Sequence, residues 1–491
     1  MIVERIRGNI SKHKPEYSLA FVTIILFFYF TPILDEGDCG DYLRYAEKFL
    51  GLNSILFPYR SPLYPLILAG LIKVFGYEAL PNLVLAIQLV LLYCTSLLVK
   101  KTFSLVALSE NKLNLILYLT FFNLSALYYS FMFITEVLSW FLFTLSIYLL
   151  LKAIVSGENK FYALAGVCTG ITILSRYNLI PLLPLFFIII ALRLFILRKE
   201  PGIKFVKDIF LKSSVYGFSL LAVLLCWSFV NLSVNGNFGL FPGAGVSGGA
   251  KKGTGVPFYV GRNALIATID SSLKISDSNT KVYEIFLEAS AKIKAKNRID
   301  ENSWMNLLGE ENKQLLASSF IGYKVYNEAT IKLFEFYDIK TGNESLLNEK
   351  LGGFYDEVYQ QTNGKVNYIR IVSFVYSLWV SSSLQNAPEK GDINFNVFPG
   401  FLITLHKLYW LCVMVGFVIV SLYLLFKARM SLNKETDFLA FSLILIIHSL
   451  LLTNVIFNTI NDASRFKFPV EALVIGILVY SSTKIKLPFK K

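Results

Sequence analysis

Charged residues are scarce in this chain of 491 residues, at 16% of the total. A soluble domain carries about 25%. Hydrophobic residues reach 55%, and they gather in blocks long enough to cross a bilayer, which takes about 20 apolar residues per helix. The shortage of charge therefore excludes an ordinary soluble domain and predicts an all-α polytopic membrane protein.

Cysteine and histidine are also rare, and their placement argues against two common kinds of site. The five cysteines contain no Cys-x-x-Cys pair, and the three histidines lie far apart in the chain. Neither a disulfide framework nor a zinc site is therefore expected. Residues 243–255 are rich in glycine but lack the GxxxxGK[ST] pattern of a phosphate-binding loop, so a flexible loop is the favoured interpretation.

The net charge of +13 indicates membrane topology rather than a nucleic-acid partner. Lys and Arg lie in short runs between apolar blocks, within residues 5–14, 100–101, 198–207, 427–429 and 484–491. Such runs mark cytoplasmic loops. We therefore expect a multi-pass protein of the plasma (inner) membrane, with both termini in the cytoplasm and the bilayer as its first partner.

About ten transmembrane helices are expected. They are predicted at residues 18–34, 80–99, 113–134, 137–155, 161–176, 178–197, 212–234, 400–426, 438–460 and 466–482. Residues 63–75 are apolar but short, so a juxtamembrane helix and a further span both remain open there.

Three regions follow from these spans. Residues 1–234 form an N-terminal transmembrane module whose first external loop, 35–62, carries juxtamembrane helices. Residues 235–399 form a larger external loop or lid region, which the order of the spans places on the same side as 35–62. It is expected to be mainly helical, because its glycine-rich start is followed by apolar residues at helical spacing. Residues 400–491 form the C-terminal transmembrane helices.

The first external loop concentrates charge in a chain that otherwise has little. If it is helical, Asp38, Tyr42, Ala46 and Leu50 share one face, and Asp41 lies on a neighbouring face. A carboxylate held beside a membrane and partly desolvated is suited to act as a general base. A solvated acidic loop that helps to set topology is the alternative.

Further charged residues are expected on the same external side. Arg60 precedes SPLYP, and its guanidinium suits bidentate phosphate binding, although a lone Arg also snorkels to lipid headgroups. Glu136, Arg176 and Arg465 lie at predicted helix ends. Each alone fits an interfacial anchor, whereas together they could surround a pocket for a lipid-linked anion.

The order of these residues resembles a known pattern. Membrane glycosyltransferases of the GT-C type carry Gly-Asp, then Tyr and Ala at intervals of four, then Leu-Gly, an Arg-Pro-Pro-x-Tyr-Pro segment and a helix ending in Phe-Gly. This sequence has Gly37-Asp38, Tyr42, Ala46, Leu50-Gly51, YRSPLYP and Phe75-Gly76. It resembles the glycosyltransferase family 39-like group, which includes protein O-mannosyltransferases and lipid A aminoarabinose transferases.

The resemblance extends to Thr135-Glu136, to Arg176 after a span and to SRFKFPVEA, which contains Arg465. There are two departures. Ser61 replaces the first proline, and Cys39 follows Asp38 where the two named subgroups have Glu. Asp41 and Asp35 offer other registers, but Asp38 is preferred because Tyr42, Ala46 and Leu50 then match.

The resemblance implies an inverting transfer of a monosaccharide from a polyprenyl-phosphate donor to a hydroxyl of a protein, lipid or glycan. Asp38, or else Asp41, would be the base. Arg60, with Arg176 or Arg465, would bind the donor phosphate, and Tyr42, Tyr64 and Glu136 would support the site. No nucleotide is needed, and external carboxylates are compatible with a divalent metal without requiring one.

Two competing functions are less well supported. A polysaccharide polymerase or ligase would use a diphosphate-linked oligosaccharide donor and is not expected to show this order of residues. A transporter or flippase predicts charges buried in the middle of spans and an internal repeat. The sequence shows no repeat, and its charges are expected at helix ends.

Overall fold

A computed structural model describes residues 13–32, 38–52, 61–197, 203–235, 238–240, 400–427, 432, 434–457 and 463–484. This part of the chain is helical and contains no β-strand. Nearly all of it belongs to one compact unit, which comprises residues 1–242, 379–452 and 464–491. Of the expected external region 235–399, residues 241–399 lie outside the described residues.

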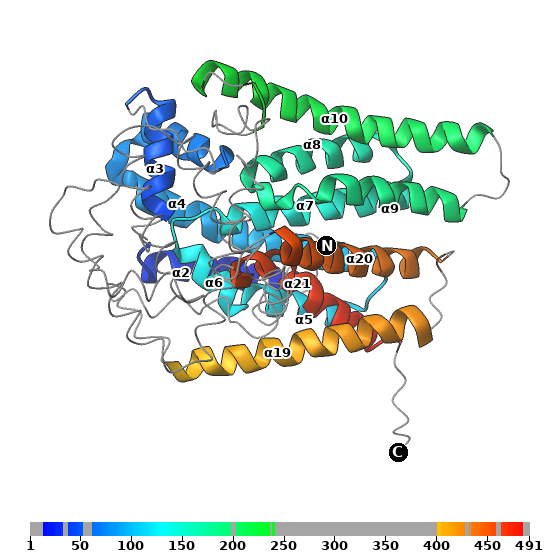
Figure 1. Cartoon of the computed structure of the whole chain (residues 1–491). Coiled ribbons are helices and arrows are strands. Elements are labelled where there is room, and N and C mark those ends of the chain that lie inside the picture. Colours follow the sequence, from blue (N-terminus) through cyan, green and yellow to red (C-terminus); the bar gives the residue numbers. More distant parts are fainter. Residues whose placement is uncertain are drawn as a thin grey trace, which may run out of the picture. The chain divides into compact units, whose positions relative to one another are not determined.

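The bounds of the helices are α2 Lys14–Tyr29, α3 Asp38–Phe49, α4 Leu63–Ser104, α5 Glu110–Phe121, α6 Leu124–Phe131, α7 Glu136–Ser156, α8 Asn159–Ser175, η1 Tyr177–Leu179, α9 Leu182–Leu197, α10 Ile203–Asn235, α19 Gly400–Leu422, η3 Tyr423–Lys427, α20 Glu435–Phe457 and α21 Ala463–Ser481. Helices α7, α8, α9, α10, α19 and α20 run roughly along one direction, whereas α3 stands across them (Figure 1).

Six helices among the described residues are long and apolar enough to cross a bilayer. They comprise α4, α7, residues 177–196, and most of α10, α19 and α20. The number of ten is not confirmed, because α2 and α8 have only 16 and 17 residues and the apolar part of α21 is shorter still. The membrane character predicted from composition is nevertheless evident in these long apolar helices.

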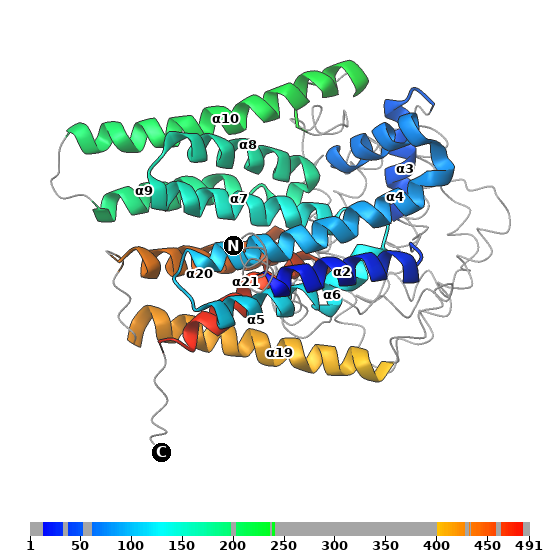
Figure 2. The ribbon, with the colours of Figure 1, turned by 180° about the vertical axis from the view of Figure 1, so that it is seen from behind.

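Helix α4 is bent sharply at Gly76, which has φ 78° and ψ 175°. Positive φ is accessible to glycine at little cost because it has no Cβ. The Nε2 atom of Gln88 lies 3.4 Å from the Tyr64 hydroxyl, whereas a straight helix would separate these residues by about 36 Å. Residues 63–75 therefore form a separate first arm that folds back on the second (Figure 2). This arm, about 20 Å long, is too short to span alone.

The prediction of one continuous span over residues 113–134 is wrong, because the helix breaks between α5 and α6. Asn123 is extended, and its side-chain oxygen accepts hydrogen bonds from the backbone N–H groups of Ser125 and Ala126. This is an N-cap, which satisfies donors that the new helix leaves unpaired. The cap that Asn123 forms therefore stabilises the break within a mostly apolar run.

Helices α2, α4 and α5 are joined by an ionic cluster near one end. Lys100 Nζ donates to Glu16 Oε1 and to Asn114 Oδ1, each at 2.7 Å. Burial, the largest single effect, raises the pKa of Glu16, but the hydrogen bond from Lys100, a backbone hydrogen bond and the charges of Lys100 and His13 together outweigh it, and the pKa is lowered overall. Glu16 is therefore held as a carboxylate beside the cation.

Helix α8 packs between α7 and α10 (Figure 1). Its glycines Gly166 and Gly170 face α10: a Cβ at Gly166 would clash with the Tyr216 carbonyl oxygen, and one at Gly170 would lie 2.9 Å from Val223 Cβ. Small residues four apart let helix backbones approach closely in a membrane. Close approach of α8 and α10 therefore requires both glycines.

Replacing Gly166 by Ala should lower the Tm in detergent, because the new methyl group meets backbone rather than a flexible side chain. We expect a loss of about 1–3 kcal/mol. Gly70→Ala is the matched control, since nothing lies within 4 Å of its Cβ position; it should be neutral or stabilising by up to about 1 kcal/mol. Equal Tm values for both variants would contradict the close packing.

Candidate functional site

Helix α3 begins at Asp38, within the predicted first external loop. Tyr42, Tyr45 and Ala46 are buried on it, so the face defined by residues 42 and 46 is the packed face, and Asp38 stands one turn before Tyr42 along the helix. Helix α3 packs against α4. The prediction that this loop carries a helix is therefore confirmed for residues 38–49.

Tyr42 links α3 to two other segments. Its ring meets that of Tyr64 edge to face, with centroids 5.2 Å apart, and its hydroxyl lies 3.4 Å from Thr135 Oγ1. Tyr64 belongs to the first arm of α4, and Thr135 is the residue before α7. Three segments far apart in the sequence thus meet around one tyrosine.

Glu136 and Arg176 form a buried ion pair, with Oε1 2.9 Å from Nη1. The glutamate side chain has no exposed area and the arginine side chain is 14% exposed. Glu136 is the first residue of α7 and Arg176 follows the last residue of α8. A carboxylate at a helix N-terminus and a cation at a C-terminus each complement the helix dipole.

Residues beside the predicted arginines are also in contact. The Tyr177 N–H donates to Ser61 Oγ at 3.2 Å; Tyr177 follows Arg176, and Ser61 follows Arg60. The Tyr177 hydroxyl and Trp227 Nε1 both donate to the Leu240 carbonyl at 2.7 Å. Tyr177 and Trp227 therefore hold Leu240 in place after α10.

The structure brings Tyr42, Tyr64, Glu136 and Arg176 together. Asp38 and Asp41 lie on α3, and Arg465 lies on α21, but their side chains are outside the described part of the chain. Arg60 and Asp35 are outside it altogether. The catalytic and phosphate-binding roles of these residues stay predictions.

Sequence reasoning missed Gln88, which is 2% exposed and lies on the second arm of α4. Its Nε2 atom donates to the Ile134 carbonyl at 3.0 Å and to the Tyr64 hydroxyl. The available signal was a single amide within the apolar block 80–99. A lone polar side chain in such a block needs an internal partner.

Glu471 was also missed, and it corrects an expectation. It is 2% exposed within α21, and Asn123 Nδ2 donates to its Oε2 at 3.1 Å. The expectation that charges lie only at helix ends is therefore wrong for this residue. Asn123 stands at the break between α5 and α6, so the pair joins that break to α21.

Metal ligands do not gather in the described ranges: no group of three or more His, Cys, Asp or Glu there could hold an ion. Around Tyr42 the described residues offer the hydroxyls of Tyr42, Tyr64 and Thr135, and the Glu136–Arg176 ion pair lies next to Thr135. Such groups orient an anionic or hydroxylated ligand.

Breaking the ion pair should destabilise the protein strongly. Glu136→Gln and Arg176→Gln should each cost about 3–5 kcal/mol, because each leaves a buried charge without its partner. The double variant should lose less than the sum of the two, measured as Tm in detergent.

Glu158→Gln is the control for this prediction. It breaks a shorter pair, Glu158 with Lys160 at 2.6 Å, but these side chains are 47% and 65% exposed. An exposed pair contributes about 0–1 kcal/mol. A Glu136→Gln variant as stable as Glu158→Gln would show that burial does not govern the pair.

The chain was compared with protein-family models, with curated proteins and with solved structures, and none of them matches.

Proposed function

We propose that the protein is an inverting glycosyltransferase. It moves a monosaccharide from a polyprenyl-phosphate donor to a hydroxyl acceptor at the external face of the plasma membrane. In this proposal the termini are cytoplasmic, and residues 35–62 and 235–399 are external. The acceptor is a protein, a lipid or a glycan.

The observation that carries the proposal is the contact of α3 with two other segments, the first arm of α4 and the residues just before α7. Tyr42 touches both Tyr64 and Thr135, and Thr135 precedes the buried Glu136–Arg176 pair. Residues that resemble the glycosyltransferase pattern therefore converge from three segments. A binding site needs a few polar side chains from different segments of the chain to meet in one place.

In the proposed reaction Asp38 accepts the proton of the acceptor hydroxyl, with Asp41 as the alternative base. The hydroxyl oxygen forms a bond to the anomeric carbon while the bond from that carbon to the phosphate oxygen breaks. The electron pair leaves with the polyprenyl phosphate. A single displacement of this kind inverts the configuration at the anomeric carbon.

The arginines divide the work of stabilising the leaving phosphate. Arg176 is paired with Glu136, so its net charge is largely balanced, and its remaining N–H groups act as oriented donors. We assign the main compensation of developing charge to Arg60, with Arg465 as a further candidate. Tyr42 and Tyr64 hold the surrounding segments in place.

Membranes carrying the full chain should transfer label from radiolabelled polyprenyl-phosphate sugars. Asp38→Asn should lower the transfer rate by about 100-fold or more, because a general base contributes on that scale. Asp41→Asn should have a smaller effect. Transfer is measured by counting the label released from the donor and recovered in the acceptor fraction.

Glu110→Gln serves as the control, since Glu110 is 70% exposed and lies on another helix. Normal transfer by Asp38→Asn and loss in Asp41→Asn would reassign the base. Normal transfer by both variants would leave the loop with a topological role only. Use of diphosphate-linked oligosaccharides in place of monophosphate donors would favour the polymerase or ligase reading.

A transporter or flippase is the second candidate, and Glu471 is the observation that favours it. A buried carboxylate inside an apolar helix, beside a broken helix, is common in transport pathways. If the protein transports, Glu471→Gln in proteoliposomes should abolish substrate flux while sugar transfer is absent in the wild type. If it is a transferase, wild-type proteoliposomes should transfer sugar and show no flux.

A further inference from the structure

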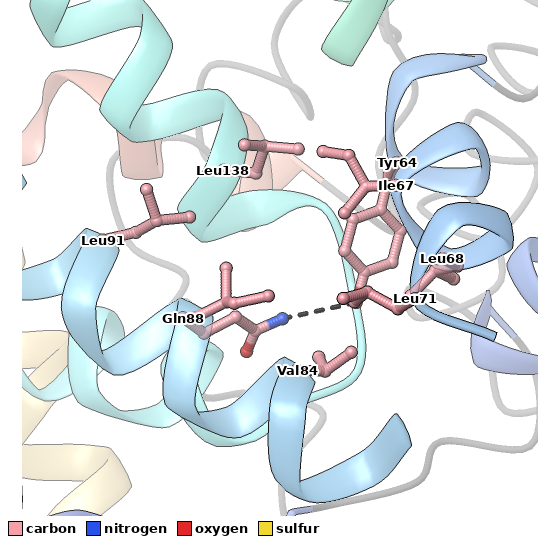
Figure 3. A pocket seen from close by; sticks show the side chains of 9 residues that line it. Tyr64, Ile67, Leu68, Leu71, Val84, Gln88, Leu91 and Leu138 are labelled. Atoms are coloured by element: carbon pink, nitrogen blue, oxygen red, sulfur yellow. Dashed lines mark hydrogen bonds between the residues drawn. The ribbon is translucent and has the colours of Figure 1, made fainter. Parts of the chain in front are cut away.

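Gln88 lies in a small pocket between the two arms of α4 (Figure 3). The pocket is lined by both arms and by Leu138 of α7. Apart from Tyr64 and Gln88, its lining is aliphatic, and Figure 3 shows the Gln88 amide pointing across it toward the tyrosine. A buried amide in such surroundings contributes through the few hydrogen bonds that it makes.

The orientation of this amide is fixed by its neighbours. The Ile134 carbonyl can only accept, so the group that faces it at 3.0 Å must be the amide nitrogen. The same nitrogen lies 3.4 Å from the Tyr64 hydroxyl, and its second hydrogen is directed there. Tyr64 therefore accepts from Gln88.

The two hydrogen bonds of Gln88 reach two parts of the site whose relative position matters: the arm that supports α3, and the segment that precedes α7. Tyr64 packs against Tyr42 of α3, the helix that begins at Asp38. Ile134 lies two residues before Glu136, whose carboxylate pairs with Arg176. One side chain thus connects the first arm of α4 to the segment that starts α7, and its own backbone belongs to the second arm.

We propose that Gln88 is a positioning residue for sugar transfer: its amide nitrogen holds Tyr64 and the Ile134 carbonyl at a fixed separation, and so sets α3 relative to the Glu136–Arg176 pair. This inference rests on the proposed function. Gln88 touches no reacting atom, and it acts through Tyr64 and Ile134.

The test compares variants of the full chain by kcat, KM and Tm. Gln88→Met keeps the side-chain volume but removes both donors, and should lower kcat by about tenfold to hundredfold through misplacement. KM should change less than about threefold, because no substrate contact is lost. Gln88→Glu should fall between Gln88→Met and the wild type, since a carboxyl group buried in this aliphatic pocket keeps its proton and its one O–H can replace only one of the two donors.

Tyr64→Phe completes a double-mutant cycle with Gln88→Met. If the two residues act as one unit, the double variant should be no slower than the slower single variant. Thr95→Val is the control: Thr95 is buried on the same arm and donates to the Leu91 carbonyl of its own helix. It should keep kcat within about twofold of the wild type.

Wild-type kcat in Gln88→Met, or a Gln88→Glu variant as active as wild type, would overturn the inference. If wild-type protein transfers no sugar, the proposed function fails, and the coupling of Gln88 to Tyr64 is tested by Tm alone. The Tm losses of Gln88→Met and Tyr64→Phe should then be less than additive. Additive losses of Tm would show that Gln88 and Tyr64 are not coupled and would overturn the inference as well.

Discussion

A buried carboxylate inside an apolar helix bundle needs a cation, and the pairing of Glu136 with Arg176 meets that need at the ends of two neighbouring helices. Helices α7 and α8 are antiparallel, joined by a turn in which Gly157 has φ 70°. The start of α7 therefore lies beside the end of α8. The carboxylate and the cation each sit where the helix dipole favours them, and the segments before and after them, Thr135 and Tyr177, make the contacts of the candidate site.

The bend at Gly76 brings the first arm of α4 against neighbouring segments. An apolar arm of 13 residues, 63–75, buries too little surface to stay folded back without partners. It gains them from the Gln88 amide and from the rings of Tyr42 and Phe133. The arm in turn supports α3, which has few apolar residues outside its packed face. The position of α3 is therefore fixed by a few contacts of Tyr64. Small changes of side chain at these contacts should alter the geometry of the candidate site more than the stability of the protein.

The proposed chemistry suits the balance of charge. A leaving lipid phosphate develops negative charge where water is scarce, and arginines can compensate that charge. Before the donor binds, however, a buried arginine without an anionic partner would be costly. Pairing Arg176 with Glu136 removes that cost and keeps its donors oriented. Glu471 is a different case: it lies inside α21 and bonds to Asn123 at a helix break, which is why a transport function retains a specific structural argument.

Sequence alone determined the class of protein, most of the helices and the helical reading of α3. Hydrophobic length and the spacing of Tyr42 and Ala46 are local properties of the chain. It did not determine the break at Asn123, because one amide hardly alters the hydropathy of an apolar block. Nor did it identify the partners of Gln88, Glu136 and Glu471. Those partners are distant in the sequence and lie mostly in the segments between helices, and only the tertiary structure decided them, because a buried polar group is satisfied by whatever donor or acceptor packing brings within about 3 Å.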